Sequence, residues 1–292
     1  MQKTPISVIS GFLVAGKTTL LRKIIAQLDR KFAVIMNEFG EIGIDTQVIQ
    51  GKNVDVVELA GGCVCCSLIG EFQDAVREVV EKYHPEIIIV ETTGVAEPDA
   101  LILDISDNMK DVRIDSVITV ADADGILRFS SIGRTGAVQI EMADIVLLNK
   151  IDLIAPQQLE LVKQRIREFN KKAPIIETTY CDVDIDLLFS LEIEHHINKV
   201  HTAHHTRFDS FTYTLPRPVD REAFEEMLVK LPAAVYRLKG FVAFEEEGNH
   251  FLNYVAGRWE LEQMDAEQKV LVFIGEGILS QKTQIVHMLE SL

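Results

Sequence analysis

A glycine-rich segment near the N-terminus has the residue types that bind phosphate. Residues 11–19 spell GFLVAGKTT and match the pattern G-x-x-x-x-G-K-S/T. In this pattern backbone N–H groups wrap the phosphates at a helix N-terminus, the lysine reaches the β- and γ-phosphates, and the hydroxyl ligates Mg²⁺. We therefore expect Lys17 to be catalytic and Thr18 to hold Mg²⁺. The expected nucleotide contacts are Gly11, Val14, Ala15, Gly16, Lys17, Thr18 and Thr19.

A second motif favours guanine over adenine as the base. The sequence Asn149-Lys150-Ile151-Asp152 follows an apolar run, and open α/β sheets bind ligands where their strands end. The aspartate can accept hydrogen bonds from the ring N–H and the amino group of guanine, a pair that adenine does not offer. We expect Asn149, Lys150 and Asp152 to contact GTP or GDP.

Two carboxylates end other apolar runs at positions suited to the γ-phosphate and its Mg²⁺. Glu91 is followed by Gly94, whose N–H can meet the γ-phosphate while Glu91 holds Mg²⁺ or a water, so both are expected to act in catalysis. Glu38 is expected to ligate Mg²⁺, with a solvated loop glutamate as the alternative. Val95 stands where Ras-like enzymes carry a water-orienting glutamine. Intrinsic turnover should therefore be slow, on the order of 10⁻⁴ to 10⁻² s⁻¹.

Three of the four cysteines are clustered, as Cys63, Cys65 and Cys66. Thiolates are soft ligands that suit Zn²⁺, Co²⁺ or Ni²⁺, and Gly61 and Gly62 permit the turn that would face three of them to one ion. Three ligands leave a fourth position open for exchange. The alternatives are inert burial and a disulfide between the two adjacent cysteines, which would be strained and out of place in a reducing compartment.

The sequence assigns no definite role to the other side chains that could ligate a metal. The segment 192–207 lacks apolar periodicity and carries five histidines, so weak metal binding and a solvated linker are both open. These histidines are His195, His196, His201, His204 and His205. Cys181 stands alone and is expected to be an ordinary thiol.

The motifs need a scaffold that brings strand ends together, and the chain has the pattern for one. Short apolar runs alternate with amphipathic stretches as far as about Phe189, which predicts a doubly wound, mostly parallel α/β domain of the P-loop type over 1–191. After the linker 192–207, a smaller α+β domain is expected over 208–292. Its expected strands are 208–214, 236–244, 250–262 and 269–274, and its expected helices are 220–230 and 279–292.

Composition limits the partners. The formal net charge of -16 argues against nucleic acid and anionic membranes, because both attract cationic surfaces. No apolar run approaches the roughly 18 residues of a membrane helix, and the N-terminus lacks a signal-peptide pattern. We therefore expect a cytoplasmic protein whose cysteines stay reduced.

Taken together and in order, these motifs resemble the CobW-like family of metallochaperone GTPases over nearly the whole chain. The matching segments are 11–19, 37–41, 61–66, 91–94 and 149–152. The resemblance implies a GTPase domain, a histidine-rich linker and a CobW-type C-terminal domain, with Cys63, Cys65 and Cys66 as metal ligands. It also implies GTP-dependent delivery of Zn²⁺, Co²⁺ or another divalent ion to a client metalloprotein or a metal-cofactor assembly protein, together with nucleotide-linked dimerisation.

One position departs from the family pattern. The family usually has glycine where Val14 stands, and a β-branched residue is costly there if the backbone needs φ > 0 or approaches the phosphate closely. We therefore expect the affinity for GTP or its hydrolysis to be altered.

The C-x-C-C motif lies between the two candidate switch segments, so a γ-phosphate that orders both could reshape the metal site. Metal affinity and nucleotide state would then be coupled, each altering the other equally.

Two other functions compete with that of a metallochaperone. They are a GTP-binding switch with a purely structural zinc, and a small-molecule P-loop kinase, which the motif at 149–152 disfavours because such kinases mostly use ATP.

Overall fold

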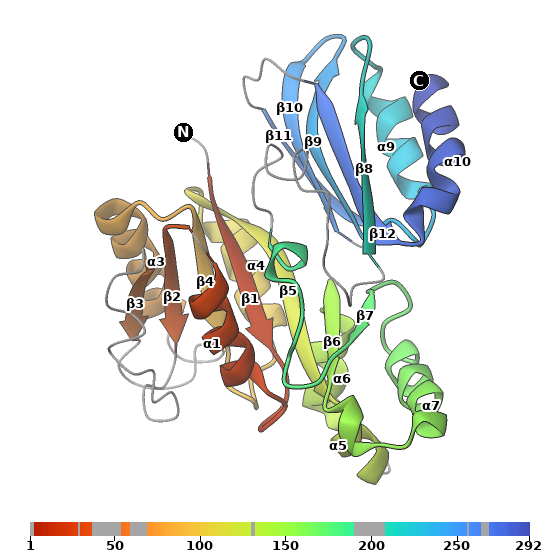
Figure 1. Cartoon of the computed structure of the whole chain (residues 1–292). Coiled ribbons are helices and arrows are strands. Elements are labelled where there is room, and N and C mark those ends of the chain that lie inside the picture. The colour runs from red at the N-terminus through yellow and green to blue at the C-terminus, as the bar shows by residue number, and fades with distance from the viewer. Residues whose placement is uncertain are drawn as a thin grey trace. The chain divides into compact units, whose positions relative to one another are not determined.

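The computed structural model describes residues 3–28, 30–36, 54–58, 69–129, 132–189, 208–255, 257–263 and 269–292. The chain divides into two compact units, Met1–Phe189 and Ser190–Leu292 (Figure 1). Among the described residues, no helix combines the length and the apolar character needed to cross a bilayer.

The first unit is built on a parallel sheet. Its described strands are β1 (Thr4–Ser10), β2 (Phe32–Met36), β3 (Val54–Glu58), β4 (Ile87–Glu91), β5 (Val112–Asp122), β6 (Ile145–Asn149) and β7 (Ile175–Glu177). They lie in the order β3-β2-β4-β1-β5-β6-β7, and every neighbouring pair is parallel. All residues of β2 and β6 are buried, as expected for strands covered on both faces. The predicted doubly wound P-loop fold is confirmed.

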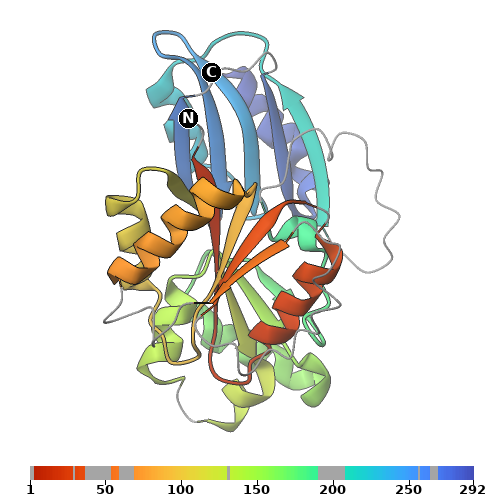
Figure 2. The ribbon, with the colours of Figure 1, turned by 90° about the vertical axis from the view of Figure 1, so that its left-hand side faces the viewer.

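Helices lie on both sides of this sheet, as Figure 2 shows. The helices are α1 (Lys17–Gln27), α3 (Ile69–Tyr83), α4 (Asp99–Asn108), α5 (Ala123–Arg128), α6 (Gly133–Glu141) and α7 (Pro156–Arg167). Two single turns of 3-10 helix are η2 (Ile151–Leu153) and η3 (Ile185–Leu187). On one face Val8 and Val90 pack with Phe72 of α3 and Ile105 of α4.

Helix α1 covers the opposite face and carries the phosphate loop at its N-terminus (Figure 2). Its buried apolar residues Leu20, Leu21, Ile24 and Ile25 recur at helical spacing and form one stripe. Complete burial of each contributes roughly 1.5–3 kcal/mol, so the helix that receives the phosphates is fixed firmly to the sheet.

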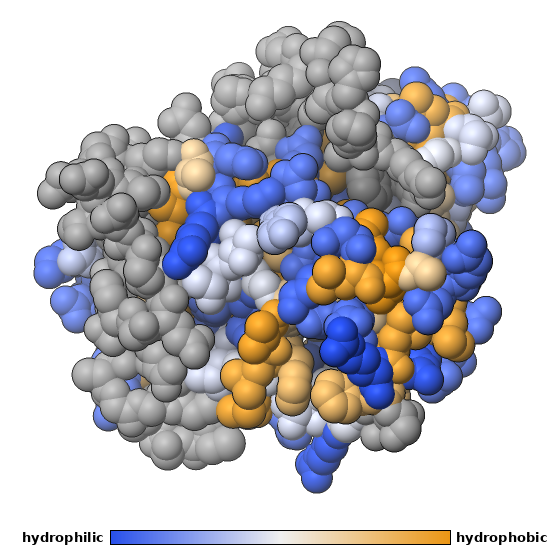
Figure 3. Space-filling model, turned by 60° about the horizontal axis from the view of Figure 1, so that its bottom comes forward, coloured by the Kyte–Doolittle hydropathy of each residue, from blue (hydrophilic) through white to orange (hydrophobic). Residues whose placement is uncertain are grey.

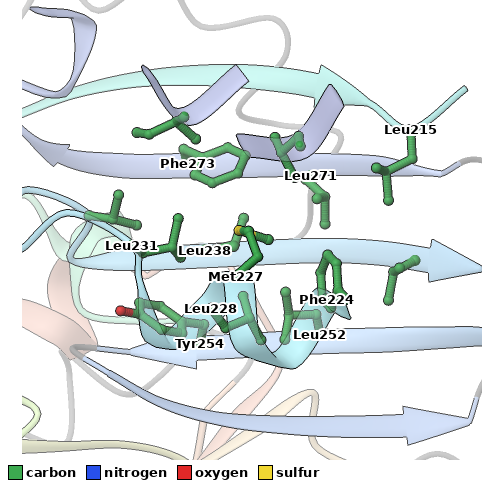
Figure 4. Packing of buried hydrophobic residues seen from close by; sticks show 14 of the residues in the cluster. Leu215, Phe224, Met227, Leu228, Leu231, Leu238, Leu252, Tyr254, Leu271 and Phe273 are labelled. Atoms are coloured by element: carbon green, nitrogen blue, oxygen red, sulfur yellow. The ribbon is translucent and has the colours of Figure 1, made fainter. Parts of the chain in front are cut away.

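The second unit is an antiparallel sheet with two helices. Its described strands are β8 (Phe208–Thr214), β9 (Arg237–Phe244), β10 (Gly248–Val255), β11 (Arg258–Gln263) and β12 (Val270–Glu276), in the order β11-β10-β9-β12-β8. Helices α9 (Arg221–Val229) and α10 (Ile278–Glu290) pack on it. Figure 4 shows Phe224 and Met227 of α9 among Leu238, Leu252 and Phe273 of the sheet.

One strand prediction in this unit was wrong. The stretch 250–262 was expected to be a single strand, but it contains the antiparallel pair β10 and β11, with Val255 opposite Arg258. The chain reverses next to Gly257, whose φ of 93° is a conformation that glycine adopts without steric cost. In the sequence Gly257 is the signal at this turn, and an isolated glycine inside a strand pattern is also compatible with a bulge, so the reversal was not predicted.

Candidate nucleotide site

The segment 11–19 joins β1 to α1 at the carboxyl edge of the parallel sheet. Gly11 and Gly16 have φ values of 138° and 120°. A Cβ atom on Gly11 would lie 2.2 Å from the carbonyl oxygen of Val120, and one on Gly16 would lie 2.5 Å from Nδ2 of Asn149. Neither position has room for a side chain, so these two glycines allow the loop to fold tightly against its neighbours.

The N-terminus of α1 is arranged to receive an anion. Gly16 occupies the N-cap position, and no side chain caps the helix with a hydrogen bond. Uncapped N–H groups and the helix dipole attract negative charge. Nζ of Lys17 donates hydrogen bonds to the carbonyl oxygens of Gly11 at 2.9 Å and Phe12 at 3.2 Å, which holds the ammonium group inside the loop. Thr18 and Thr19 are half-buried in the first turn. The N–H groups and the Lys17 ammonium fit a nucleotide phosphate, and the Thr18 hydroxyl fits the Mg²⁺ that accompanies it.

Val14 has a left-handed backbone, with φ of 62°, and its side chain is 82% exposed. A β-branched residue in this region is strained by on the order of 1–3 kcal/mol, and so exposed a side chain gains little packing to offset that cost. A cost of valine at position 14 was expected if the backbone there has φ > 0, and the backbone meets this condition.

Replacing Val14 with glycine should stabilise the protein. Relief of strain exceeds the extra backbone entropy of glycine in the unfolded chain, so we expect the free energy of unfolding to rise by about 1 kcal/mol. Thermal or denaturant unfolding of Val14→Gly measures this. Val95→Gly is the matched control, because this exposed loop valine does not have a positive φ. Strain at position 14 is refuted if both variants lose stability equally.

Asn149, buried at the end of β6, joins three segments of the site. Its Nδ2 donates a hydrogen bond to the carbonyl oxygen of Ala15 at 2.9 Å. Its Oδ1 accepts hydrogen bonds from Oγ1 of Thr178 at 3.2 Å and from the backbone N–H of Cys181 at 2.8 Å. The side chain therefore ties the phosphate loop to the turn that follows β7.

The rest of this motif lies at the surface beside Asn149. Lys150 has φ of 62°, and its Nζ forms an ion pair with the carboxylate of Asp122 at 2.7 Å. Asp122 ends β5 and also caps α5, because its side chain accepts a hydrogen bond from the N–H of Gly125. Asp152 lies in η2 with its side chain exposed, so its carboxylate is accessible to a base.

The candidate γ-phosphate segment packs directly against the phosphate loop. Glu91 ends β4 beside Ile9 of β1, and both the N–H and Oγ1 of Thr92 donate hydrogen bonds to the carbonyl oxygen of Ile9, at 3.0 and 3.2 Å. A Cβ atom on Gly94 would lie 2.6 Å from the backbone nitrogen of Leu13. The structure therefore brings Gly94 to the loop that holds Lys17.

Figure 3 views the molecule from below, the direction in which the parallel strands of Figure 1 point. Hydrophobic patches lie between hydrophilic ones on this face. Several exposed apolar side chains belong to the site segments. They are Phe12, Leu13, Val14 and Val95.

Three residues that contact the site segments, Gln139, Thr178 and Cys181, were not predicted from the sequence to do so. Nε2 of Gln139 on α6 donates hydrogen bonds to the carbonyl oxygens of Gly94 at 3.3 Å and Ala96 at 2.9 Å. The turn of Thr178 and Cys181 follows a short apolar run, and that placement at a strand end is a signal that could have identified it. No comparable signal distinguishes Gln139 from other polar residues of its helix.

Cys181, which was expected to be an ordinary thiol, lies beside the phosphate loop. Its Sγ donates a hydrogen bond to the carbonyl oxygen of Gly16 at 3.4 Å. Burial raises the pKa of the Cys181 thiol to about 12, so it stays protonated at neutral pH. As a chemical group it is the unreactive thiol that was expected.

The predicted metal ligands Cys63, Cys65 and Cys66, the predicted Mg²⁺ ligand Glu38 and the linker 192–207 with its five histidines lie outside the described residues. Within the residues that are described, no group of three or more His, Cys, Asp and Glu side chains is placed to hold a metal ion.

Comparisons with known proteins agree with this geometry. Residues 5–177 match the family described as CobW/HypB/UreG, nucleotide-binding domain, and residues 208–291 match the cobalamin synthesis protein cobW C-terminal domain. The chain is 31% identical over 289 residues to the zinc chaperone CobW of Sinorhizobium sp, covering 82% of this chain and 81% of that one. It is 29% identical to the zinc chaperone YjiA of Escherichia coli, covering 94% and 95%.

One further relative and a crystal structure of YjiA extend the comparison. The zinc-regulated GTPase metalloprotein activator 1 of Schizosaccharomyces pombe is 36% identical over 198 residues, covering 63% of this chain and 48% of that one. The crystal structure of Zn(II)-bound YjiA GTPase from Escherichia coli matches with a TM-score of 0.51 at 23% identity, covering 100% of this chain and 99% of that one. This last likeness shows a shared fold.

Proposed function

Because the chain belongs to the CobW/HypB/UreG family, we propose that its GTP cycle controls the binding and delivery of a divalent transition metal. Family membership makes the protein a metallochaperone GTPase. The proposal adds the cargo, the metal site and the client. Zinc is the first candidate as cargo and cobalt the second, and the client is a metalloprotein or a protein that assembles a metal cofactor.

The observation that carries the nucleotide part is the hydrogen-bond set of Asn149. One side chain holds both the carbonyl of Ala15 in the phosphate loop and the N–H of Cys181 in the turn after β7. Two loops that come from distant parts of the sequence thereby lie next to each other, which supports a single nucleotide site that contacts both. The exposed carboxylate of Asp152 supports guanine as the base.

In hydrolysis, the chain's own residues position the phosphates. Lys17 would leave the carbonyls that it now contacts and neutralise the β- and γ-phosphates. Thr18 and Glu38 would hold Mg²⁺, which supplies charge neutralisation when bound. Glu91 would hold Mg²⁺ or a water, and the N–H of Gly94 would bind the γ-phosphate. Nucleotide contacts are further assigned to Gly11, Val14, Ala15, Gly16, Thr19, Asn149, Lys150 and Asp152.

The cargo site is proposed at Cys63, Cys65 and Cys66. The zinc named in the descriptions of the relatives favours a soft-ligand site for that ion. The motif lies in the sequence between Glu38 and Glu91, so a segment ordered by the γ-phosphate on either side would change its geometry. Dimerisation linked to the nucleotide stays a prediction.

The experiment that tests the cargo site is an anaerobic zinc titration against a competing chelator. Replacing Cys65 with serine should lower the zinc affinity by more than the about 10–100-fold that changes in the second coordination shell cost, since a direct ligand is lost. Cys181→Ser is the matched control and should bind zinc like the wild type, because Cys181 is buried and held protonated. Unchanged affinity in Cys65→Ser would remove the proposed site.

A further inference from the structure

Gln139 is a buried amide, 1% exposed, that contacts the segment carrying Gly94. Its Nε2 donates hydrogen bonds to the carbonyl oxygens of Gly94 and Ala96, at 3.3 and 2.9 Å. We propose that Gln139 is a positioning residue of the GTPase: it orients the Gly94 peptide toward the γ-phosphate, and so sets both the rate of hydrolysis and the preference for GTP over GDP. The inference rests on the proposed role of Gly94.

The direction of the Gly94 N–H is fixed by a turn that Gln139 anchors. The N–H of Ala96 donates a hydrogen bond to the carbonyl oxygen of Thr93 at 3.0 Å, which closes the turn. That carbonyl and the N–H of Gly94 belong to the same planar peptide and point in opposite directions. Whatever holds this turn in place therefore also aims the Gly94 N–H.

The turn contacts two separate parts of the fold. The backbone of Leu13 approaches Gly94 so closely that a Cβ added to Gly94 would lie 2.6 Å from the Leu13 nitrogen. The two N–H groups of one amide can serve two carbonyls, and Gln139 donates hydrogen bonds to those of both Gly94 and Ala96. A shift of the turn away from α6 would break the hydrogen bonds to Gln139.

The anchor is itself rigid. Gln139 lies in α6, and its own carbonyl oxygen accepts a hydrogen bond from Oγ1 of Thr119 in β5 at 2.7 Å. The central sheet therefore fixes the helix at the residue whose side chain holds the turn. A side chain tied in this way orients the γ-phosphate segment before the nucleotide arrives, which lowers the cost of binding the transition state.

The test replaces Gln139 with methionine, which keeps the length and loses both donors. We expect kcat for GTP hydrolysis to fall about tenfold and the ratio of GTP to GDP affinity to fall severalfold, with GDP affinity unchanged, because Gly94 faces only the γ-phosphate. Gln139→Asn keeps an amide with a shorter reach and should lose less. If Gln139→Met does not fold, kcat and the ratio of GTP to GDP affinity are measured on Gln139→Asn.

Asn170→Leu is the matched structural control. Asn170 is another buried amide, and its Nδ2 donates hydrogen bonds to the carbonyl oxygens of Ile140, in the last turn of α6, and of Ala143, just after the helix, both at 2.8 Å. This variant should lose thermal stability while kcat and the GTP to GDP ratio stay as in the wild type. If Gln139→Met loses stability but keeps both quantities within about twofold, Gln139 is merely structural and the inference is overturned.

Gly94→Ala separates this inference from the function on which it rests. Alanine keeps the N–H, but its Cβ would lie 2.6 Å from the backbone nitrogen of Leu13 and would therefore displace the N–H from its present position. If Gly94→Ala leaves hydrolysis and nucleotide preference unchanged, the proposed role of Gly94 fails, and that of Gln139 fails with it. If Gly94→Ala impairs both while Gln139→Met impairs neither, only the inference about Gln139 fails.

Discussion

Replacing Lys17 with alanine is expected to lower GTP hydrolysis about a thousandfold. Lys17 is 7% exposed, and its ammonium group is held by the carbonyls of Gly11 and Phe12 within the phosphate loop. A charge in such a poorly solvated position interacts with phosphate far more strongly than it would in water. The variant also removes the positive charge that is expected to contact the β- and γ-phosphates, so binding of GTP should weaken together with kcat.

Single-turnover phosphate release with Mg²⁺-GTP measures this effect. Lys23→Ala is the matched control, because Lys23 lies on the same helix but pairs with the exposed Asp182 at 2.6 Å. Surface ion pairs contribute little, so this variant should hydrolyse GTP at close to the wild-type rate. Equal rates for Lys17→Ala and Lys23→Ala would show that the loop at 11–19 is not the site of hydrolysis.

A second large effect is expected from Asp152→Asn, which should weaken GTP binding about a hundredfold. Two carboxylate oxygens can accept hydrogen bonds from the ring N–H and the amino group of guanine. An asparagine offers one acceptor and one donor, so its amide would face the amino group of guanine. Xanthine has a carbonyl in place of that amino group, and the variant should therefore bind XTP better than GTP.

Competition between GTP, XTP and ATP for one fluorescent nucleotide measures the base preference. Asp182→Asn serves as the control, because Asp182 is also an exposed aspartate, in the turn next to Cys181. The control should keep the wild-type preference for GTP. If Asp152→Asn keeps it too, the motif at 149–152 does not recognise the base.

Much of the fold could be predicted because parallel strands buried on both faces leave a direct trace in the sequence. The apolar run that became β6 ends at Asn149, and the run that became β4 ends at Glu91, so polar residues after such runs marked the carboxyl edge of the sheet. The phosphate loop was predictable for another reason. Its glycines are required by the close approaches of Val120 and Asn149, and close approach leaves glycine as the only choice.

Hydrogen bonds between segments that are distant in the sequence cannot be recognised from a residue pattern. Gln139 contacts Gly94, which is 45 residues away, and Asn149 contacts Cys181, which is 32 residues away. Each depends on how a helix or a turn is placed on the finished sheet, so an isolated glutamine or cysteine carries no local pattern that reveals its partner. Val14 is an intermediate case. The family pattern marked the position, and its φ of 62° supplies the physical reason why glycine is favoured there.

We propose that nucleotide state and metal affinity are coupled in this GTPase. The measurement that tests it most directly is the zinc dissociation constant of the wild-type protein, determined anaerobically with Mg²⁺-bound non-hydrolysable GTP analogue and with Mg²⁺-GDP. We expect the two values to differ by about tenfold or more, and zinc to shift the preference between the two nucleotides by the same factor, because coupling is reciprocal. Equal zinc affinities in the two nucleotide states would contradict the account.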